Sequence, residues 1–444
     1  DWWHRDTPTR FGAYDKNAQG EVGCGTFPEE LLERTQVVLQ VGTADDPRRT
    51  KAQLASVIKC VDNVIIVSDK NHTYGASAHE AIDVLAFLPA KTYLKESDYA
   101  IYERQKTAPN GEGDPEAWKL DKYKFLPGIE YAVAQSPNAE WFVFLQPDTY
   151  FFWDNVFRLL ENYDYTLPYY FGSPSPGHVL PPDDANAENP IWYAFNGPGF
   201  ILSHATAHRL VDRPTNALGV RGPRLAVEYA DRIREDCCGD SILAWALHDK
   251  ADVRLSGLWP MFNPRGIADP PFGKRKRFWC EPVVGLHGVG LEDMEGLWRW
   301  EMERERGERP LLYADLIEFT QLGRFTRRLH WDAVGAEGFV LPEGHAAHAD
   351  LLACEEACRE EGECYQWTWH GRHCYMSREI RVGKEGKVFE GVDAAFTSGW
   401  DTDKIRRYRH SKRCEAGPHW VRPSVERRGV RSGFRLGMHC WSLG

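Results

Sequence analysis

The chain has 444 residues, a length that corresponds to about three domains at roughly 150 residues each. Lys and Arg total 54 and Asp and Glu total 65, so the formal net charge is −11, and this balance argues against a protein that binds nucleic acid through its phosphates. Hydrophobic residues make up 42% and charged residues 27%, which is typical of a globular protein and excludes a disordered chain.

From its N-terminus, the chain reads as a polar stem over residues 1–30, followed by alternating strands and helices. Strands are predicted at residues 36–41, 63–67, 141–145 and 169–171. Helices are predicted at residues 48–59 and 121–135 and from Cys238 onward. A polar surface loop is expected over residues 96–116, a Pro-rich loop after Phe171 and a turn over residues 196–199. The alternation predicts an α/β domain with a mainly parallel sheet, in which ligands bind beyond the carboxyl ends of the strands.

No apolar stretch approaches the ~20 residues that cross a membrane. Because the chain begins at Asp1 without a signal peptide, we expect a luminal or secreted fragment from which any N-terminal anchor is missing. The sequon at residues 71–73 fits a secretory route.

The chain has 11 Cys, so at least one has no partner within it. Four of them lie between Cys354 and Cys374, at spacings that differ from the paired C-x-x-C pattern of zinc ribbons, so disulfides and an oxidising compartment are expected. A disulfide from Cys237 or Cys238 to Cys280 is predicted as a further clamp.

Two motifs carry carboxylates in positions suited to chemistry. A hydrophobic strand at 141–145 delivers Asp148 to its carboxyl end, where a carboxylate can hold a divalent cation that bridges a diphosphate, or can simply cap a turn. Asp240 lies at the start of a predicted helix, whose amides favour the ionised form that a general base needs. The alternative for Asp240 is a plain helix N-cap.

Two glycine-bearing motifs complete the set. In Asn196-Gly197-Pro198-Gly199, the glycines allow a close approach of the backbone to a ligand, or a structural turn. His287 follows an apolar strand between Gly285 and Gly288 and is either a ligand for a manganese-like ion or a structural histidine.

Together these four motifs resemble, in the same order, the motif set of glycosyltransferase family 31, the inverting β1,3-glycosyltransferases that include Fringe and the core 1 galactosyltransferases. The fungal Fringe-like members are the most similar. The metal motif of the family usually carries further Asp residues, where this chain has Gln146-Pro147, and the first Gly of its glycine-rich motif is Asn196 here. The first strand with Gly42 and Thr43, the Val67-Ser68-Asp69 segment and Lys124 also resemble the nucleotide-binding part of the family.

The resemblance implies a GT-A, Rossmann-like fold and a UDP-sugar donor. It implies a Mn²⁺ site, or a site for another divalent cation, formed by Asp148 and His287, and makes Asp240 the catalytic base. The donor contacts that it implies are Gly42, Thr43, Asp69, Lys124, Asp148, Asn196, Gly197 and Gly199.

The C-terminal cysteine cluster resembles a PAN/Apple module, a small α+β domain, and that resemblance implies the pairs Cys354–Cys374 and Cys358–Cys364. The expected domains are a stem at 1–30, a GT-A domain at 31–326 and a PAN/Apple-like domain with a basic tail at 327–444.

The expected function is transfer of a hexose or N-acetylhexosamine, with galactose favoured, from a UDP-sugar to a hydroxyl of a glycan or glycoprotein in a β1,3-type linkage. The expected setting is the Golgi lumen, with membrane attachment only through the missing anchor, or the exterior. The alternative is a catalytically degenerate protein of the secretory pathway that binds glycans or proteins.

Overall fold

The computed structural model describes residue 24 and residues 27–74, 79–109, 112–179, 190–268, 272, 276–304, 309–335, 338–386, 395–414 and 417–423. The chain divides into two compact units, the first formed by residues 1–264, 284–308 and 421–444 and the second by residues 265–283 and 309–420. Most of the expected stem and the basic tail beyond residue 423 lie outside the described residues. The second unit takes in chain that precedes the boundary expected at Arg327.

The first unit is built on a sheet with the strand order β3-β4-β2-β1-β5-β8-β7-β9 within the described residues. Its strands are β1 (Thr35–Gln40), β2 (Val64–Ser68), β3 (His72–Tyr74), β4 (His79–Asp83), β5 (Trp141–Leu145), β7 (Tyr170–Val179), β8 (Pro190–Ser203) and β9 (Ser256–Gly257). Strands β4, β2, β1 and β5 are parallel neighbours, whereas β8 runs antiparallel to both β5 and β7. The prediction of an α/β unit with a largely parallel sheet is confirmed.

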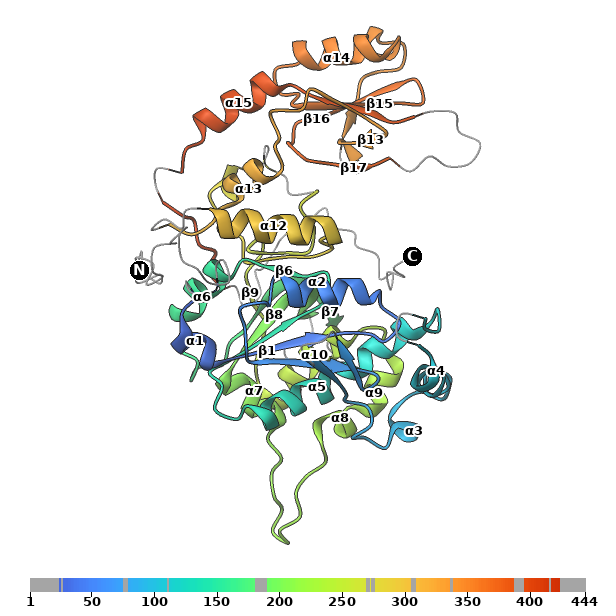
Figure 1. Ribbon diagram of the computed structural model, residues 1–444, viewed down its shortest axis with the longest axis vertical. Coiled ribbons are helices and arrows are strands. Elements are labelled where there is room, and N and C mark those ends of the chain that lie inside the picture. Colours follow the sequence, from blue (N-terminus) through green and yellow to red (C-terminus); the bar gives the residue numbers. More distant parts are fainter. Residues whose placement is uncertain are drawn as a thin grey trace. The chain divides into compact units, whose positions relative to one another are not determined.

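Helices pack along this sheet and supply much of the core (Figure 1). They are α1 (Glu29–Glu33), α2 (Pro47–Ala55), α3 (Ala90–Tyr93), α4 (Glu96–Thr107), α5 (Asp121–Gln135), α6 (Trp153–Glu161), α7 (His204–Val211), α8 (Leu225–Glu228), α9 (Ala230–Glu235), α10 (Gly239–Ala251) and α12 (Leu291–Glu303). Helix α10 packs against β8, α5 and α7, and α2 packs against α12. Phe144 of β5 stacks on Phe200 of β8 with ring centroids 4.5 Å apart, which buries two large apolar side chains beside α10.

Two predicted loops are wrong in part, because helix α4 replaces the first half of one and strand β7 extends into the other. Within residues 96–116, α4 forms because Ile101 and Tyr102 are buried on one face, and the Tyr102 hydroxyl donates to Asp83 Oδ2 over 2.7 Å. Residues 172–179 of the Pro-rich segment continue β7, with Pro174 and Pro176 opposite residues of β8, and the rest of the segment lies outside the described residues. Strand β9 pairs with β7 only at Phe171 and Gly172, so β7 has a single neighbouring strand at the two prolines, and proline is tolerated at such edge positions.

The predicted turn at 196–199 is an interruption of pairing inside a continuous strand. Gly172 of β7 pairs with Phe200 of β8, whereas the next residue, Ser173, pairs with Phe195. Residues Asn196–Gly199 therefore have no partner in β7, and we call them the β8 bulge. Such bulges redirect side chains and often lie next to active sites.

A small sheet, in the order β10-β11-β6, lies in the same unit. Its strands are β10 (Phe262–Asn263), β11 (Gly285–Leu286) and β6 (Tyr150–Phe151). Leu286 pairs with Tyr150 in antiparallel register. This pairing brings the residue after β11, which is His287, next to the residues that precede β6, among them Asp148.

The second unit is an antiparallel sheet, in the order β12-β18-β15-β16-β14, with a separate β13-β17 pair. Its strands are β12 (Arg327–Leu329), β13 (Trp331–Asp332), β14 (Phe339–Val340), β15 (Gln366–His370), β16 (His373–Ser377), β17 (Lys384–Glu385) and β18 (Thr397–Trp400), and its helices are α11 (Lys276–Trp279), α13 (Tyr313–Phe319), α14 (Leu351–Glu360) and α15 (Thr402–Ser411). None of the helices in the described parts of the chain combines the length and apolar character needed to cross a membrane.

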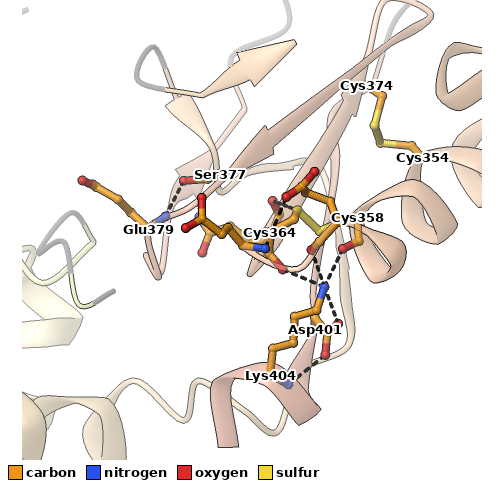
Figure 2. Close-up of a disulfide and its surroundings, with 11 residues drawn as sticks. Cys354, Cys358, Cys364, Cys374, Ser377, Glu379, Asp401 and Lys404 are labelled. Carbon is orange, nitrogen blue, oxygen red and sulfur yellow. Dashed lines mark hydrogen bonds and ion pairs between the residues drawn. A yellow bond between two sulfur atoms is a disulfide. The ribbon is translucent and has the colours of Figure 1, made fainter. Parts of the chain in front are cut away.

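Disulfides tie α14 into this unit (Figure 2). Cys354 of α14 bonds Cys374 of β16, and Cys358 of α14 bonds Cys364, so both pairs implied by the resemblance are confirmed. The Lys404 ammonium of α15 donates to the carbonyls of Cys358, Glu361 and Cys364 at 2.7, 2.7 and 3.2 Å, which caps the end of α14.

The predicted clamp to Cys280 is wrong. Cys237 and Cys238 bond each other, and Cys280 bonds Cys414. Cys280 and Cys414 are brought together within the second unit, where the Trp279 indole N–H donates to the Lys412 carbonyl over 2.6 Å. A further disulfide, Cys24–Cys60, lies in the first unit.

Candidate active site

The ends of β1 and β2 gather one group of the predicted site residues. The backbone N–H and the hydroxyl of Thr43 both donate to Asp69 Oδ1, at 2.8 and 3.1 Å. Asp69 is 1% exposed, so its carboxylate is committed to holding the chain after β1 against the chain after β2. Gly42 precedes Thr43, and its N–H donates to Asp45 Oδ2 over 2.7 Å.

Lys124 of α5 lies beneath this group and is fully buried. Its ammonium donates to the Val41 carbonyl at 2.7 Å, pairs with Asp121 at 2.6 Å and lies 3.8 Å from Asp69 Oδ1. Burial opposes the charge, but the neighbouring carboxylates outweigh it and raise the pKa of Lys124 overall. Lys124 therefore stabilises this group through its hydrogen bond to the end of β1 and its attraction to the carboxylates of Asp121 and Asp69.

Asp45 is a member of this group that the sequence did not reveal. Asp45 is exposed as a residue, but desolvation of its carboxylate and the nearby Asp121 carboxylate raise its pKa to about 6, while the Lys124 charge acts in the opposite direction. The helix after it, α2, carries Arg49, whose guanidinium Nη1 lies 3.9 Å from Asp148 Oδ2. Neither residue belongs to a recognisable motif, and only the fold brings them to the site.

Asp148 is presented by a tight turn after β5. The Thr149 N–H donates to the Gln146 carbonyl over 3.0 Å, and the Thr149 hydroxyl accepts from the Gln146 N–H over 3.0 Å. Pro147 occupies the second position of this turn, where its fixed φ is favourable. The Gln146-Pro147 pair thus builds the turn that projects a single carboxylate.

His287 faces that carboxylate. Its Nε2 lies 3.4 Å from Asp148 Oδ2, and the Val289 N–H donates to the Asp148 carbonyl over 3.0 Å. The other ring nitrogen, Nδ1, lies 3.2 Å from the Pro264 carbonyl, which can only accept, so Nδ1 carries the proton. In the neutral ring, the lone pair of Nε2 then points toward the Asp148 carboxylate. An imidazole nitrogen that faces a carboxylate oxygen can bind a divalent cation, and a carbonyl that accepts from the other ring nitrogen orients the imidazole for this role.

The β8 bulge packs against both His287 and the turn that carries Asp148. A Cβ at Gly197 would lie 2.4 Å from Cγ of His287, so only glycine allows the imidazole to lie against the backbone there. The Gly197 carbonyl accepts from the Thr149 hydroxyl over 2.6 Å. Gly199 has φ +78°, and a Cβ there would lie 2.3 Å from the Phe151 ring.

Asp240 is held by the same bulge. The Asn196 N–H donates to Asp240 Oδ2 over 3.2 Å, and the Ser241 N–H donates to Oδ1 over 2.9 Å. Asp240 is 8% exposed, and burial raises its pKa to about 6, although these backbone N–H groups lower it. The carboxylate is therefore ionised at neutral pH with a proton affinity close to the value that suits a general base.

The fold thus collects the predicted residues into two groups along one edge of the sheet. Gly42, Thr43, Asp69 and Lys124 lie at the ends of β1 and β2, and Asp148, His287, Asn196, Gly197, Gly199 and Asp240 lie around the β8 bulge. Because β1 and β5 are parallel neighbours, with Leu39 opposite Leu145, the chain leaves both strands at the same edge. What each residue binds stays a prediction.

The described residues include a further cluster with side chains of the metal-binding type. A carboxylate oxygen of Asp236 and the Sγ atoms of Cys237 and Cys238 lie within 4.8 Å of one another just before α10. Both sulfurs are in a disulfide, and a metal ligand would have to be a thiolate. The cluster therefore carries no metal site in this oxidised form.

Residues 118–253 match the model of the Fringe-like family, a family of glycosyltransferases. This stretch contains Lys124, Asp148, the β8 bulge and Asp240, whereas His287 and the chain after β1 and β2 lie outside it. No curated protein matches the chain significantly.

The close packing at Gly197 predicts a measurable cost for adding one methyl group. Gly197→Ala should lower the free energy of unfolding by about 1–3 kcal/mol, because the imidazole or the bulge must shift. The matched control is Gly222→Ala, where the nearest atom, the Pro214 carbonyl oxygen, lies 3.4 Å from the added Cβ. The control should stay within about 0.5 kcal/mol of the wild type in urea unfolding, and an equal effect of both variants would contradict the packing argument.

The buried charge of Asp240 predicts that Asp240→Asn stabilises the protein at neutral pH. The folded-state pKa of about 6 lies above the ordinary value of 3.8, so the folded state holds the proton more tightly and ionisation costs stability as the pH rises from about 4 to about 6. The variant should be more stable by about 1–3 kcal/mol above pH 6, and the difference should shrink toward zero near pH 4. Thermal unfolding across this range measures it, and a difference independent of pH would refute the assignment.

Proposed function

We propose that the protein is an inverting glycosyltransferase of the secretory pathway that uses a UDP-sugar donor. It transfers a hexose or N-acetylhexosamine, with galactose as the favoured sugar, to a hydroxyl of a glycan or glycoprotein in a β1,3-type linkage. One observation carries the proposal. The β8 bulge of a Fringe-like domain contacts both a buried carboxylate, Asp240, and the imidazole of His287, which faces Asp148.

Asp148 and His287 are the residues that would hold Mn²⁺ or another divalent cation. Such an ion supplies positive charge to the diphosphate of the donor, which stabilises the leaving UDP. The donor set of one carboxylate and one imidazole fits a site that a diphosphate completes. Arg49, close to Asp148, adds a second positive group at the same position.

Asp240 is the proposed general base. Its carboxylate accepts the proton of the acceptor hydroxyl while that oxygen attacks the anomeric carbon and the bond from this carbon to the diphosphate breaks. The backbone N–H groups of Asn196 and Ser241 fix the orientation of the carboxylate, and they leave its remaining lone pairs for the incoming hydroxyl. Burial keeps the pKa of Asp240 near 6, so the base is ionised at neutral pH yet basic enough to take up the proton.

The group at the ends of β1 and β2 is the proposed nucleotide site. Gly42 and Thr43 offer backbone close to a ligand, and Asp69 holds Thr43 in place. Lys124 supports the same chain from beneath through the Val41 carbonyl. This location follows the rule that ligands of α/β sheets bind beyond the carboxyl ends of the parallel strands.

The second unit is the proposed PAN/Apple-like module, in which paired disulfides fasten α14 to the sheet. We assign it either to holding a glycan acceptor or to stabilising the transferase. The disulfides of both units favour an oxidising compartment, and a Golgi lumen or secreted location agrees with the Fringe-like domain.

The proposal predicts binding of UDP that depends on a divalent cation, and turnover that depends on Asp240. UDP with Mn²⁺ should raise the melting temperature, and UDP with a chelator should raise it less. In a screen of UDP-sugars for transfer or slow hydrolysis, Asp240→Asn should lower kcat by about 100-fold or more. The matched control is Asp231→Asn, whose carboxylate is 92% exposed, and it should keep the wild-type rate.

Two results would decide against parts of this proposal. Absence of stabilisation by UDP under both conditions would remove the nucleotide site and favour a degenerate protein that binds glycans or proteins. Full activity of Asp240→Asn would show that another group acts as the base.

A further inference from the structure

Within the described part of the chain, the side-chain oxygen of Asn196 is a buried acceptor without a hydrogen-bond donor. Asn196 is 5% exposed, and among the residues that the structure describes none donates to its Oδ1. The backbone N–H of the same residue is used, since it donates to Asp240 Oδ2. An unsatisfied buried acceptor costs about 1–3 kcal/mol, so a native site that retains one calls for a partner that comes from outside the chain.

The position of Asn196 indicates which partner this is. Its backbone contacts Asp240, and the next residue, Gly197, packs against the His287 imidazole. In an inverting transfer, the anomeric carbon lies between the attacking oxygen, which is beside the base, and the departing diphosphate, which is beside the cation ligands. A residue that links the base to the cation ligands therefore lies next to the transferred sugar rather than next to the nucleotide.

Resting on the proposed function, we infer that Asn196 recognises a hydroxyl group of the transferred sugar and so determines donor specificity. The hydroxyl donates its hydrogen bond to Asn196 Oδ1, which satisfies the buried acceptor. The terminal torsion of an asparagine side chain is soft, so the carboxamide can turn toward the sugar without moving the backbone that holds Asp240. A site built to hydrogen-bond a substrate hydroxyl discriminates strongly against an analogue that lacks it.

The first test is calorimetric and needs no turnover. Wild type and Asn196→Ala are titrated, in the presence of Mn²⁺, with UDP, UDP-galactose, UDP-glucose and the two UDP-N-acetylhexosamines. Asn196→Ala should bind the preferred UDP-sugar about 5- to 100-fold more weakly and UDP with unchanged affinity. Asn138→Ala, in the exposed turn between α5 and β5, is the matched control and should bind all of these as the wild type does.

The second test deletes the hydroxyl from the ligand, which leaves the fold of the protein untouched. Monodeoxy analogues of the preferred UDP-sugar are compared with the parent compound for binding and for slow hydrolysis. One analogue should bind the wild type about 5- to 100-fold more weakly than the parent UDP-sugar does. The same analogue and the parent should bind Asn196→Ala equally, since removing the hydroxyl and removing the Asn196 side chain delete the same hydrogen bond. If the alanine variant folds poorly, Asn196→Gly keeps the N–H that holds Asp240 and serves in its place.

Three results would overturn the inference while leaving the proposed function intact. The first is that Asn196→Ala binds UDP and the UDP-sugar more weakly by the same factor. The second is that the variant binds every UDP-sugar as tightly as the wild type does, and the third is that it changes only the KM of the acceptor. A wild type that binds neither UDP nor any UDP-sugar would instead remove the proposed function, and the inference with it. The wild-type titration with UDP alone separates these two kinds of failure.

Discussion

Between Gly172 and Ser173 of β7, the pairing with β8 jumps from Phe200 to Phe195, and this releases the β8 bulge from the ladder. The released backbone groups are used within the site: the Asn196 N–H holds Asp240, and the Gly197 carbonyl accepts from Thr149. Side chains larger than hydrogen would separate these parts, because a Cβ at Gly285 would lie 2.3 Å from the Pro198 carbonyl and one at Gly197 would meet the His287 ring. The distance from Asp240 to His287 and Asp148 is therefore set by backbone packing.

Burial, rather than the helix N-terminus, dominates the electrostatics of Asp240. The position at the start of α10 and two backbone N–H groups favour the carboxylate, yet loss of solvent raises its pKa to about 6. Asp45, in the neighbouring group, also has its pKa raised to about 6, chiefly by desolvation of its carboxylate. A buried acid such as Asp240 costs stability, and proteins commonly retain such costs where function needs them.

Strong local patterns predicted the central strands and helices, since 121–135 and 141–145 coincide with α5 and β5. Helix α4 was not predicted because only a few apolar residues, among them Ile101 and Tyr102, are interspersed with many charged residues, and the composition of the segment therefore resembles that of a surface loop. The β8 bulge could not be predicted from the sequence because a bulge depends on the pairing with the partner strand. The Cys280–Cys414 disulfide could not be predicted because its two cysteines are 134 residues apart in the sequence. Motifs located Asp148, Asp240 and His287, whereas Arg49 and Asp45 come to the site only through the tertiary fold.

In the proposed mechanism, Asp148 and His287 together hold one divalent cation beside Asp240, the proposed base. Pulsed electron paramagnetic resonance of Mn²⁺ in the presence of UDP tests it most directly, because a coordinated imidazole imposes nitrogen modulation on the signal. We expect this modulation in the wild type and its loss in His287→Gln, with weaker Mn²⁺ binding in Asp148→Asn. A wild-type complex that binds Mn²⁺ and UDP without nitrogen modulation would show that His287 is not a ligand of the cation.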